Sequence, residues 1–320
     1  MNKNLTIGVD LGGTNTVFGI VNPQGDILCE GSIKTKAYPT PEEFADAGVE
    51  CIKGLLDAHK DEFSFDDIRG IGIGAPNGNY LSGSIEFAAN LQWKGVVPLA
   101  QLFKDRLGLP VFVTNDANAA AIGEMKYGAA RGMKDFIVIT LGTGVGSGIV
   151  ANGQLIYGHD GFAGELGHII MIRGEQGRPC GCGRRGCLET YCSATGVART
   201  AREILSKTDK PSLLREKNPE DIESLDVSIA AGKGDEVAKE IFQYTGDMLG
   251  AACADFAAFS SPEAFIFFGG LAKAGDLIMK PIEESYNRNA LKIYQNKPKF
   301  LISELMDKNA AILGASAIVE

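Results

Sequence analysis

The sequence lacks an excess of basic residues. It carries 40 acidic and 31 basic side chains among 320 residues, which gives a net charge of -9. Proteins that bind nucleic acids usually present a basic face to the phosphate backbone. We therefore expect no nucleic-acid partner.

Long apolar runs are also missing. No run approaches the ~20 residues that a membrane-spanning helix needs, and Met1–Asn4 lead directly into a strand-like segment instead of a signal peptide. We therefore expect a cytoplasmic protein with no membrane partner and with reduced thiols. A length of 320 residues predicts one large or two moderate domains.

Three of the seven cysteines gather near a histidine. His168, Cys180, Cys182 and Cys187 are spaced as H-x11-C-x-C-x4-C. Three thiolates and one imidazole form a complete tetrahedral set for a structural zinc ion. The glycines between these cysteines allow a short loop to fold around one ion. The spacing predicts a zinc site.

Two alternatives compete with zinc: a disulfide with one free thiol, or reduced cysteines without a ligand. Cys180 and Cys182 are too close for an unstrained disulfide in most backbones. Repeated Gly–Cys and Cys–Gly pairs are poor core material, so zinc is favoured. Outside the cluster, Cys29, Cys51 and Cys253 are expected to be ordinary buried residues, and Cys192 is undecided.

Two carboxylates flank the cysteine cluster, Glu165 before His168 and Glu189 after Cys187. A metal that pins this loop would also pin both acids. We therefore expect the zinc to act as a scaffold, and the two carboxylates together with His168 to recognise a ligand.

A glycine-rich turn follows the first predicted strand. Residues 5–10 form this strand, Gly12-Gly13-Thr14 follow, and residues 17–21 form the next strand. The turn can present N–H groups and hydroxyls to a phosphate, and Asp10 can hold Mg²⁺ through water. A Walker A loop is excluded because no GKS or GKT and no helix follows. A plain β-turn is the alternative reading.

A second unit of the same kind occurs at residues 137–150. The run Thr143-Gly144-Val145-Gly146 is followed by a strand, which excludes a dinucleotide-binding fingerprint. Together with residues 7–21 it forms a short internal repeat. Two such hairpins could hold a triphosphate.

Polar residues follow a third strand end. Residues 110–114 are a predicted strand that ends on Asn115-Asp116, where a helix begins. Asp116 suits two roles, the N-cap of this helix or a general base. The strand 264–268 ends on Gly269-Gly270, which indicates a close approach of the backbone to a nucleotide base or ribose.

The remaining pattern predicts an alternation of strands and helices. A polar loop at 76–80 follows a strand at 68–75, and helix dominates 194–259. The other expected elements are a strand at 27–35, helices at 41–59 and 98–107, a helix to about 295, a strand at 299–303 and a helix at 309–319.

Four motifs make the whole chain resemble the ROK family of bacterial sugar kinases and repressors. They are Asp10–Thr14, Leu141–Gly146, the G-x-x-G-E-x-G-H of Gly161–His168 and the C-x-C-G-x-x-G-C-x-E of Cys180–Glu189. The last two are highly specific together. The resemblance implies a two-domain α/β actin-like ATPase (ribonuclease H-like) fold, with a cleft between the domains and a zinc-binding loop. The implied segments are a small domain of 1–117 plus 305–320, a large domain of 118–304, and a zinc loop at 165–190.

The resemblance also implies roles for individual residues. Asp116 resembles the base that takes a proton from the sugar hydroxyl. The implied sugar-binding residues are Gly78, Asn90, Asn115, Asp116, Glu165, His168 and Glu189. The implied nucleotide-binding residues are Asp10, Gly12, Gly13, Thr14, Thr16, Gly142, Thr143, Gly144, Gly269 and Gly270. The implied zinc ligands are His168, Cys180, Cys182 and Cys187.

The activity implied is ATP-dependent phosphorylation of a hexose at its 6-hydroxyl, with Mg²⁺ and a structural Zn²⁺. Glucose is favoured because Asn90–Trp93 and Val97–Leu99 resemble the N-L-x-W…P-L pattern of family glucokinases. The alternative substrate is an N-acetylhexosamine, GlcNAc or ManNAc. The resemblance further implies a homodimer or homotetramer.

A repressor and a non-catalytic sugar sensor are the other functions open to this family. Family repressors carry a helix-turn-helix extension before the first phosphate motif, and here that motif begins at Asp10. We therefore expect no such extension. A sensor is expected to lose the base, whereas Asp116 is present.

Overall fold

The computed structural model describes residues 4–306 and 309–319. Its contacts group the chain into two compact units. The first unit comprises Met1–Gly132, Leu155–Ala163 and Glu304–Glu320, and the second comprises Met133–Gln154 and Gly164–Ser303. The expected domain limits differ from this grouping after residue 117 and at Leu155–Ala163. Of the expected terminal segment, residues 307, 308 and 320 lie outside the described part.

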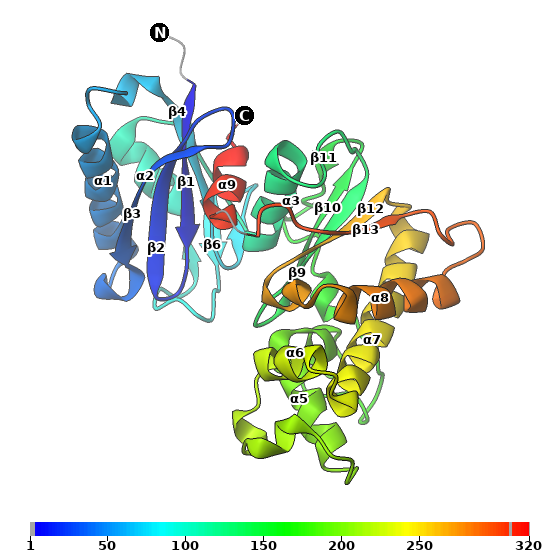
Figure 1. The fold of residues 1–320 in the computed structure, drawn as a ribbon. Coiled ribbons are helices and arrows are strands. Elements are labelled where there is room, and N and C mark those ends of the chain that lie inside the picture. Colours follow the sequence, from blue (N-terminus) through cyan, green and yellow to red (C-terminus); the bar gives the residue numbers. More distant parts are fainter. Residues whose placement is uncertain (1–3, 307–308, 320) are drawn as a thin grey trace. The chain divides into compact units, whose positions relative to one another are not determined.

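The first unit is built on a five-stranded sheet in the order β3-β2-β1-β4-β8 (Figure 1). Strands β1 to β3 are antiparallel neighbours, whereas β4 and β8 run parallel to β1. The central strands are almost wholly buried and β3, at the edge, alternates between half-buried and exposed residues. The bounds are β1 Leu5–Leu11, β2 Asn15–Val21, β3 Ile27–Lys34, β4 Ile68–Gly74 and β8 Val111–Thr114.

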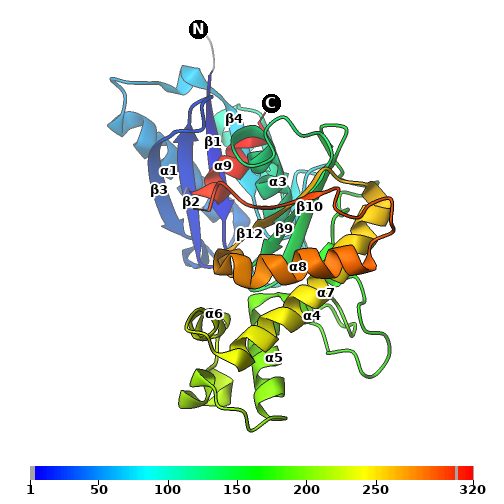
Figure 2. The same cartoon turned by 45° about the vertical axis from the view of Figure 1, so that its right-hand side comes forward.

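Helices cover both faces of this sheet, α1 and α2 on one and α3 and α9 on the other (Figures 1 and 2). Helix α9 comes especially close, because a Cβ at Gly8 or Gly72 would overlap a backbone carbonyl of α9. Glycine at these two positions lets the helix backbone rest on β1 and β4. The bounds are α1 Pro41–Ala58, α2 Leu99–Leu107, α3 Asp116–Tyr127 and α9 Ala310–Ala317.

The second unit repeats the strand arrangement of the first. Its sheet has the order β11-β10-β9-β12-β13, with β9 and β10 antiparallel and with β12 and β13 parallel to β9. The short internal repeat of strand, glycine turn and strand is therefore confirmed, and it extends to the whole sheet. The bounds are β9 Phe136–Leu141, β10 Val145–Ala151, β11 Gln154–Leu155, β12 Ala264–Phe268 and β13 Lys299–Ile302.

The helices of the second unit mostly match the expected helical stretches. Helix α8 ends at Asn289, so the prediction of helix to about 295 was wrong at its end. The Gln295 side chain donates to the carbonyls of Asn287, at 2.9 Å, and Ala290, at 3.3 Å, which closes this helix terminus. The bounds are α4 Glu189–Cys192, α5 Ala194–Leu205, α6 Ser224–Gly232, α7 Glu236–Ser260 and α8 Asp276–Asn289.

The polar loop expected at 76–80 includes the first strand of a small antiparallel sheet, which sequence reasoning did not predict. Its strands are β5 (Gly78–Asn79), β6 (Ser84–Glu86) and β7 (Val96–Val97). Strands of two or three residues are too short to show an alternating pattern, so the sequence could not predict them. The sheet fixes both ends of the loop that contains Asn90.

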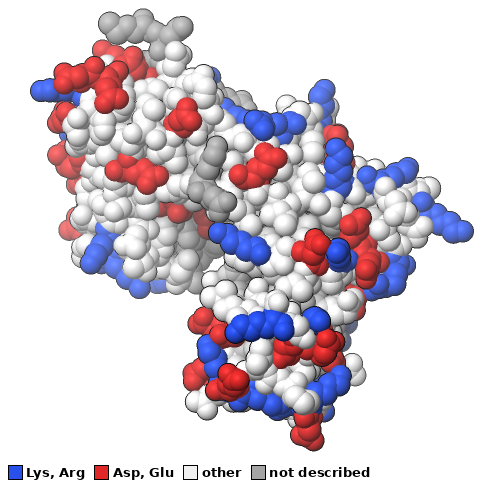
Figure 3. Space-filling model, viewed as in Figure 1, with Lys and Arg blue, Asp and Glu red and all other residues white. Residues whose placement is uncertain are grey.

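The described residues contain no helix long and apolar enough to cross a membrane. On the face of the second unit seen in Figure 3, acidic and basic side chains are interspersed. That face therefore offers none of the single-sign basic surface that nucleic acids require.

Candidate active site

The first glycine turn joins β1 to β2. The antiparallel register pairs Leu11 with Thr16, and the Gly12 N–H donates to the Asn15 carbonyl at 3.0 Å. Thr14 lies exposed at the tip. The predicted hairpin is therefore confirmed.

Two carboxylates lie at the carboxyl edge of the same sheet. Asp10 pairs in register with Gly74, and Gly74 pairs with Thr114, two residues before Asp116. Desolvation by neighbouring protein groups and, secondly, the negative charge of Asp10 raise the pKa of Asp116 to about 7. Burial also raises the pKa of Asp10. Solvent still reaches the Asp116 side chain, so this carboxyl can exchange a proton near neutral pH.

Asn115 is the N-cap of helix α3. Its side-chain oxygen accepts the Asn118 N–H at 2.7 Å. The capping role that the sequence left open for Asp116 therefore belongs to Asn115. This leaves the Asp116 carboxylate free of a capping bond, and the Asn115 amide group can still donate to a ligand.

The loop of Asn90 packs directly on the first glycine turn. A Cβ built on Gly13 would lie 2.7 Å from the Asn90 carbonyl oxygen, so only glycine fits here without a shift. The Asn90 residue itself is exposed. Trp93 anchors the loop, since its Nε1–H donates to the Tyr38 carbonyl at 3.1 Å and its ring is only 5 % exposed.

Two residues predicted to contact ligands have packing roles in the structure. The Thr16 side chain is fully buried and its hydroxyl lies 2.8 Å from that of Thr35, so it supports the turn from behind. Gly78 is buried in β5, where a side chain would overlap the Thr114 carbonyl. The buried Thr16 hydroxyl is therefore not available to a ligand, and Gly78 has only backbone groups to offer.

The second glycine turn, at Gly142–Gly144, is braced by the segment that follows the cysteine cluster. The Ala194 N–H donates to the Gly142 carbonyl at 2.8 Å, and the Thr195 hydroxyl donates to the Thr143 carbonyl at 3.1 Å. Sequence reasoning missed both contacts. The only local signal was Ser193, a typical N-cap residue, whose side chain accepts the Gly196 N–H.

Glu189 reaches the same turn. Its Oε2 accepts the Val145 N–H at 3.0 Å, and its Oε1 lies 3.8 Å from the Cys180 sulfur. The carboxylate predicted to bind sugar therefore also joins the cysteine cluster to the glycine turn. The turn and the cluster are consequently parts of one local structure.

Gly269 also lies against the second turn. It has a positive φ of 107°, and a Cβ there would lie 2.6 Å from the Leu141 carbonyl. Glycine is required for both reasons. The exposed Gly270 follows it, so the predicted adenosine-binding glycines lie beside the predicted phosphate turn.

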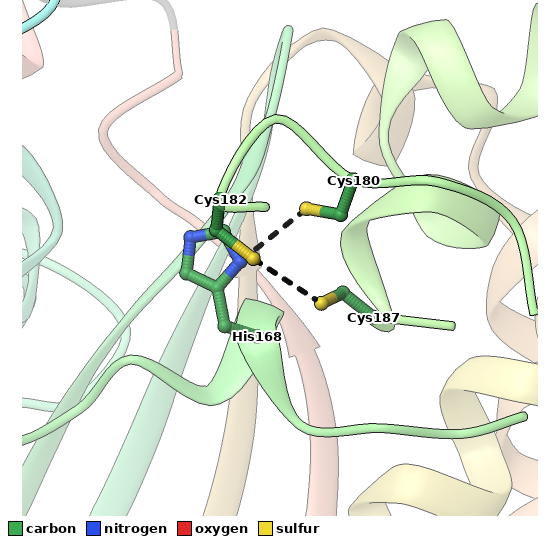
Figure 4. A group of neighbouring side chains, drawn as sticks. All are labelled: His168, Cys180, Cys182 and Cys187. Atoms are coloured by element: carbon green, nitrogen blue, oxygen red, sulfur yellow. Dashed lines mark hydrogen bonds between the residues drawn. The ribbon is translucent and has the colours of Figure 1, made fainter. Parts of the chain in front are cut away.

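The four predicted zinc ligands converge. One ligand atom from each of His168, Cys180, Cys182 and Cys187 lies within 4.8 Å of every other (Figure 4). The His168 Nδ1 is 3.8 Å from the Cys180 sulfur, and the Cys182 and Cys187 sulfurs are 3.6 Å apart. Sulfur ligands about 2.3 Å from a tetrahedral zinc lie about 3.8 Å from each other. The donor set therefore fits this ion.

The thiols of the cluster differ in proton affinity. Desolvation opposes the Cys182 thiolate, but hydrogen bonds, led by those from Arg184, lower the pKa of Cys182 to about 6. Burial and the neighbouring cysteines raise the pKa of Cys187 to about 12. A bound metal must displace the Cys187 proton, so metal binding releases protons and strengthens as pH rises.

The two ring nitrogens of His168 face different neighbouring groups. Its Nδ1 faces the sulfurs, while its Nε2 lies 3.8 Å from the Glu165 carboxylate. The Arg184 guanidinium donates to the His168 carbonyl at 2.9 Å and fixes this residue further. A metal on Nδ1 would leave Nε2 and Glu165 available to a polar ligand.

The sequence profile of the ROK family matches residues 6–320. The chain belongs to the ROK family. Among its ROK relatives, the glucokinase of Streptomyces coelicolor is 40 % identical over 89 % of this chain and 87 % of its own length.

Solved ROK structures agree with the fold described above. The ROK family glucokinase of Streptomyces griseus, in complex with glucose and AMPPNP, superposes with a TM-score of 0.78 at 37 % identity and 98 % coverage of both chains. A ROK family transcriptional regulator superposes with a TM-score of 0.84 at 25 % identity, over 98 % of this chain and 77 % of its own. The predicted fold, a mixed α/β actin-like ATPase, is therefore confirmed.

In this ROK protein the buried Arg178 precedes the cysteine cluster in the chain and contacts Thr190 and Glu203. The Arg178 side chain is 6 % exposed and pairs with Glu203 at 2.6 Å. It also donates to the Thr190 carbonyl at 2.8 Å, next to Glu189, and lies 4.6 Å from the centre of the Tyr191 ring. Arg178 therefore ties the start of the cluster to helices α4 and α5.

We expect Arg178→Ala to lower the free energy of unfolding by roughly 2 kcal/mol, because it leaves the Thr190 carbonyl and the Thr200 hydroxyl without their hydrogen-bond donor. Urea denaturation measures this loss. Arg199→Ala is the matched control, since Arg199 pairs with the same Glu203 but is 37 % exposed; it should cost less than about 1 kcal/mol. Equal losses in both variants would contradict the assigned role of Arg178.

Proposed function

We propose that this ROK protein is a glucokinase that transfers the γ-phosphoryl group of ATP to the 6-hydroxyl of glucose. The observation that carries the proposal is the position of Asp116, a solvent-accessible carboxyl. It lies at the carboxyl edge of the sheet that also presents Asp10 and the first glycine turn. The identity with a glucokinase supports glucose as the acceptor.

Asp116 is proposed as the general base. Its carboxylate takes the proton of the sugar hydroxyl as the hydroxyl oxygen attacks the γ-phosphorus. The new P–O bond forms while the bond between the γ-phosphorus and the β,γ-bridging oxygen breaks, and ADP leaves with that oxygen. Phosphoryl transfer needs mainly alignment of the reactants and charge stabilisation. The protein therefore needs to supply only one proton acceptor, a positioned general base.

The remaining site residues are proposed as ligands. In the first unit we assign sugar hydroxyls to Asn90 and Asn115. In the second we assign them to Glu165, His168 and Glu189. Carboxylates, amides and an imidazole give an uncharged polyol both acceptors and donors.

The glycine turns are proposed to bind the ATP phosphates. Gly12, Gly13 and Thr14 supply N–H groups in the first unit, Gly142–Gly144 do so in the second, and Gly269-Gly270 receive the adenosine. The Asp10 carboxylate suits Mg²⁺ held through water, and this ion would neutralise phosphate charge.

The cysteine cluster is proposed to hold one structural Zn²⁺ with His168, Cys180, Cys182 and Cys187 as ligands. Its spacing and donor atoms fit that ion, which would keep Glu165, His168 and Glu189 in place. We further propose a cytoplasmic homodimer or homotetramer, as the resemblance implied.

A coupled ADP-release assay with Mg-ATP tests the function. The panel is glucose, GlcNAc, ManNAc, mannose, fructose and allose. We expect glucose to lead in kcat/KM. GlcNAc or ManNAc in first place would replace glucose with an N-acetylhexosamine, and no turnover with any sugar would overturn the kinase proposal.

A further inference from the structure

The residues just after β3 contact both the first glycine turn and the Asn90 loop. They comprise the short 3-10 helix Thr35–Ala37 and Tyr38, which follows it. We call Thr35–Tyr38 the bracing segment. None of its residues belongs to the ligand set proposed above.

At its first residue the bracing segment holds the glycine turn. The Thr35 side chain is 2 % exposed. Its hydroxyl donates to the Gly12 carbonyl at 2.8 Å, and its backbone N–H donates to the Thr14 carbonyl at 2.9 Å. Because a hydroxyl has one proton, the 2.8 Å contact between the Thr16 and Thr35 hydroxyls must be donated by Thr16.

This arrangement sets the direction of one N–H group in the turn. In a trans peptide the C=O of Gly12 and the N–H of Gly13 point in opposite directions. Thr35 holds that carbonyl toward the buried side, so the Gly13 N–H points the other way. Within the described residues this N–H has no hydrogen-bond partner, as expected of a group reserved for a phosphate.

At its last residue the bracing segment holds the Asn90 loop. The Tyr38 carbonyl accepts hydrogen bonds from the Trp93 indole, at 3.1 Å, and from the Gln92 side chain. The Trp93 ring packs on Phe44 with 4.8 Å between centroids. Since Asn90 in turn rests on Gly13, the turn, the loop and the bracing segment form a closed set of contacts.

We propose that Thr35 is a positioning residue that aims the first glycine turn at the ATP phosphates, and that the bracing segment couples nucleotide binding there to the Asn90 loop. The proposal rests on the proposed function for the identity of the nucleotide. Its test measures nucleotide binding as well as turnover, so that this proposal and the proposed function can fail separately.

Trp93 provides the measurement, because it is the only tryptophan in the sequence. Its fluorescence reports on the Asn90 loop whichever sugar is phosphorylated. In the parent protein, we expect Mg-AMPPNP added without sugar to change the emission of Trp93. No change at saturating nucleotide would overturn the coupling.

Thr35→Val keeps the shape of the side chain and removes its hydroxyl. We expect the KM for ATP and the Kd for AMPPNP to rise about tenfold, since the Gly12 carbonyl is left unpaired. The Kd for glucose measured without nucleotide should change less than twofold, and the Trp93 response at saturating nucleotide should fall to less than half. Parental values, or equal losses for both substrates together with a lower Tm, would overturn the assignment of Thr35.

Two further variants separate the hydroxyl from general packing. Thr35→Ser retains the hydroxyl and should restore the nucleotide affinity to within about threefold of the parent; a loss as large as that of Thr35→Val would overturn the proposal. Thr245→Val is the control, because the Thr245 hydroxyl is buried and has no partner among the described residues. It should leave the nucleotide Kd and the Trp93 response unchanged.

Discussion

Asp116→Asn is expected to lower kcat by three to four orders of magnitude while glucose and nucleotide still bind. The amide keeps the size of the carboxylate and cannot accept the sugar proton, and a general base contributes typically 10²–10⁴-fold. Turnover is measured by the coupled assay, and glucose binding by titration calorimetry. Asp61→Asn, at an exposed position in the turn after α1, should match the parent. Turnover close to the parent's would remove Asp116 as the base.

The pH profile of the parent should follow the same carboxyl. Burial and Asp10 raise the pKa of Asp116 to about 7, so the ionised base is lost as pH falls through 7. We expect kcat/KM to drop about tenfold for each pH unit below that value. A flat profile between pH 5 and pH 7 would contradict this assignment.

The raised pKa also has a consequence for stability. The folded-state pKa exceeds the ordinary value of 3.8, so folding favours the protonated carboxyl and stability falls as pH rises from about 4 to 7. Asn mimics the neutral form. Because solvent reaches this side chain, screening leaves only part of the effect. We therefore expect the free energy of unfolding at pH 8 to be about 1 kcal/mol higher for Asp116→Asn than for the parent.

The placement of candidate site residues at strand ends was predictable from the sequence. Asp10 lies near the end of β1 and Asp116 comes two residues after the end of β8, and parallel strands bring their carboxyl ends to one edge of the sheet. The cysteine cluster was predictable for a similar reason, since its four side chains are close in the chain. In both cases a short stretch of sequence is enough to predict where the candidate residues lie.

Contacts between distant segments could not be predicted in this way. Thr35 lies 23 residues from the Gly12 carbonyl that it holds, and Glu189 lies 44 residues from Val145. A lone threonine or glutamate has many possible partners, and only the folded chain selects one. The sequence offered Asp116 as the possible N-cap of α3, whereas the structure gives that role to Asn115. The two could not be told apart because both side chains are good N-caps and are adjacent in the chain.

The proposed zinc site gives the second large expected effect. Cys182→Ser should release about one zinc ion per chain, because it removes one of four ligands from a site whose affinity depends on all of them. Cys182 is exposed, so the substitution itself disturbs little packing. Metal analysis of freshly purified protein measures the loss. Cys29→Ser, at a half-buried cysteine outside the cluster, should retain the parental zinc content.

Loss of the metal should weaken both substrates, since two proposed sugar ligands and one glycine turn depend on the same loop. His168 is itself a proposed metal ligand, and Glu189 accepts the Val145 N–H beside the second turn. We expect the Kd for glucose to rise at least tenfold and that for AMPPNP to rise severalfold in Cys182→Ser. If the parent contains no zinc, the cluster is not a metal site. If the variant loses zinc but binds both ligands normally, Glu189 and His168 are held by the protein fold alone, and the metal has no part in aligning the site.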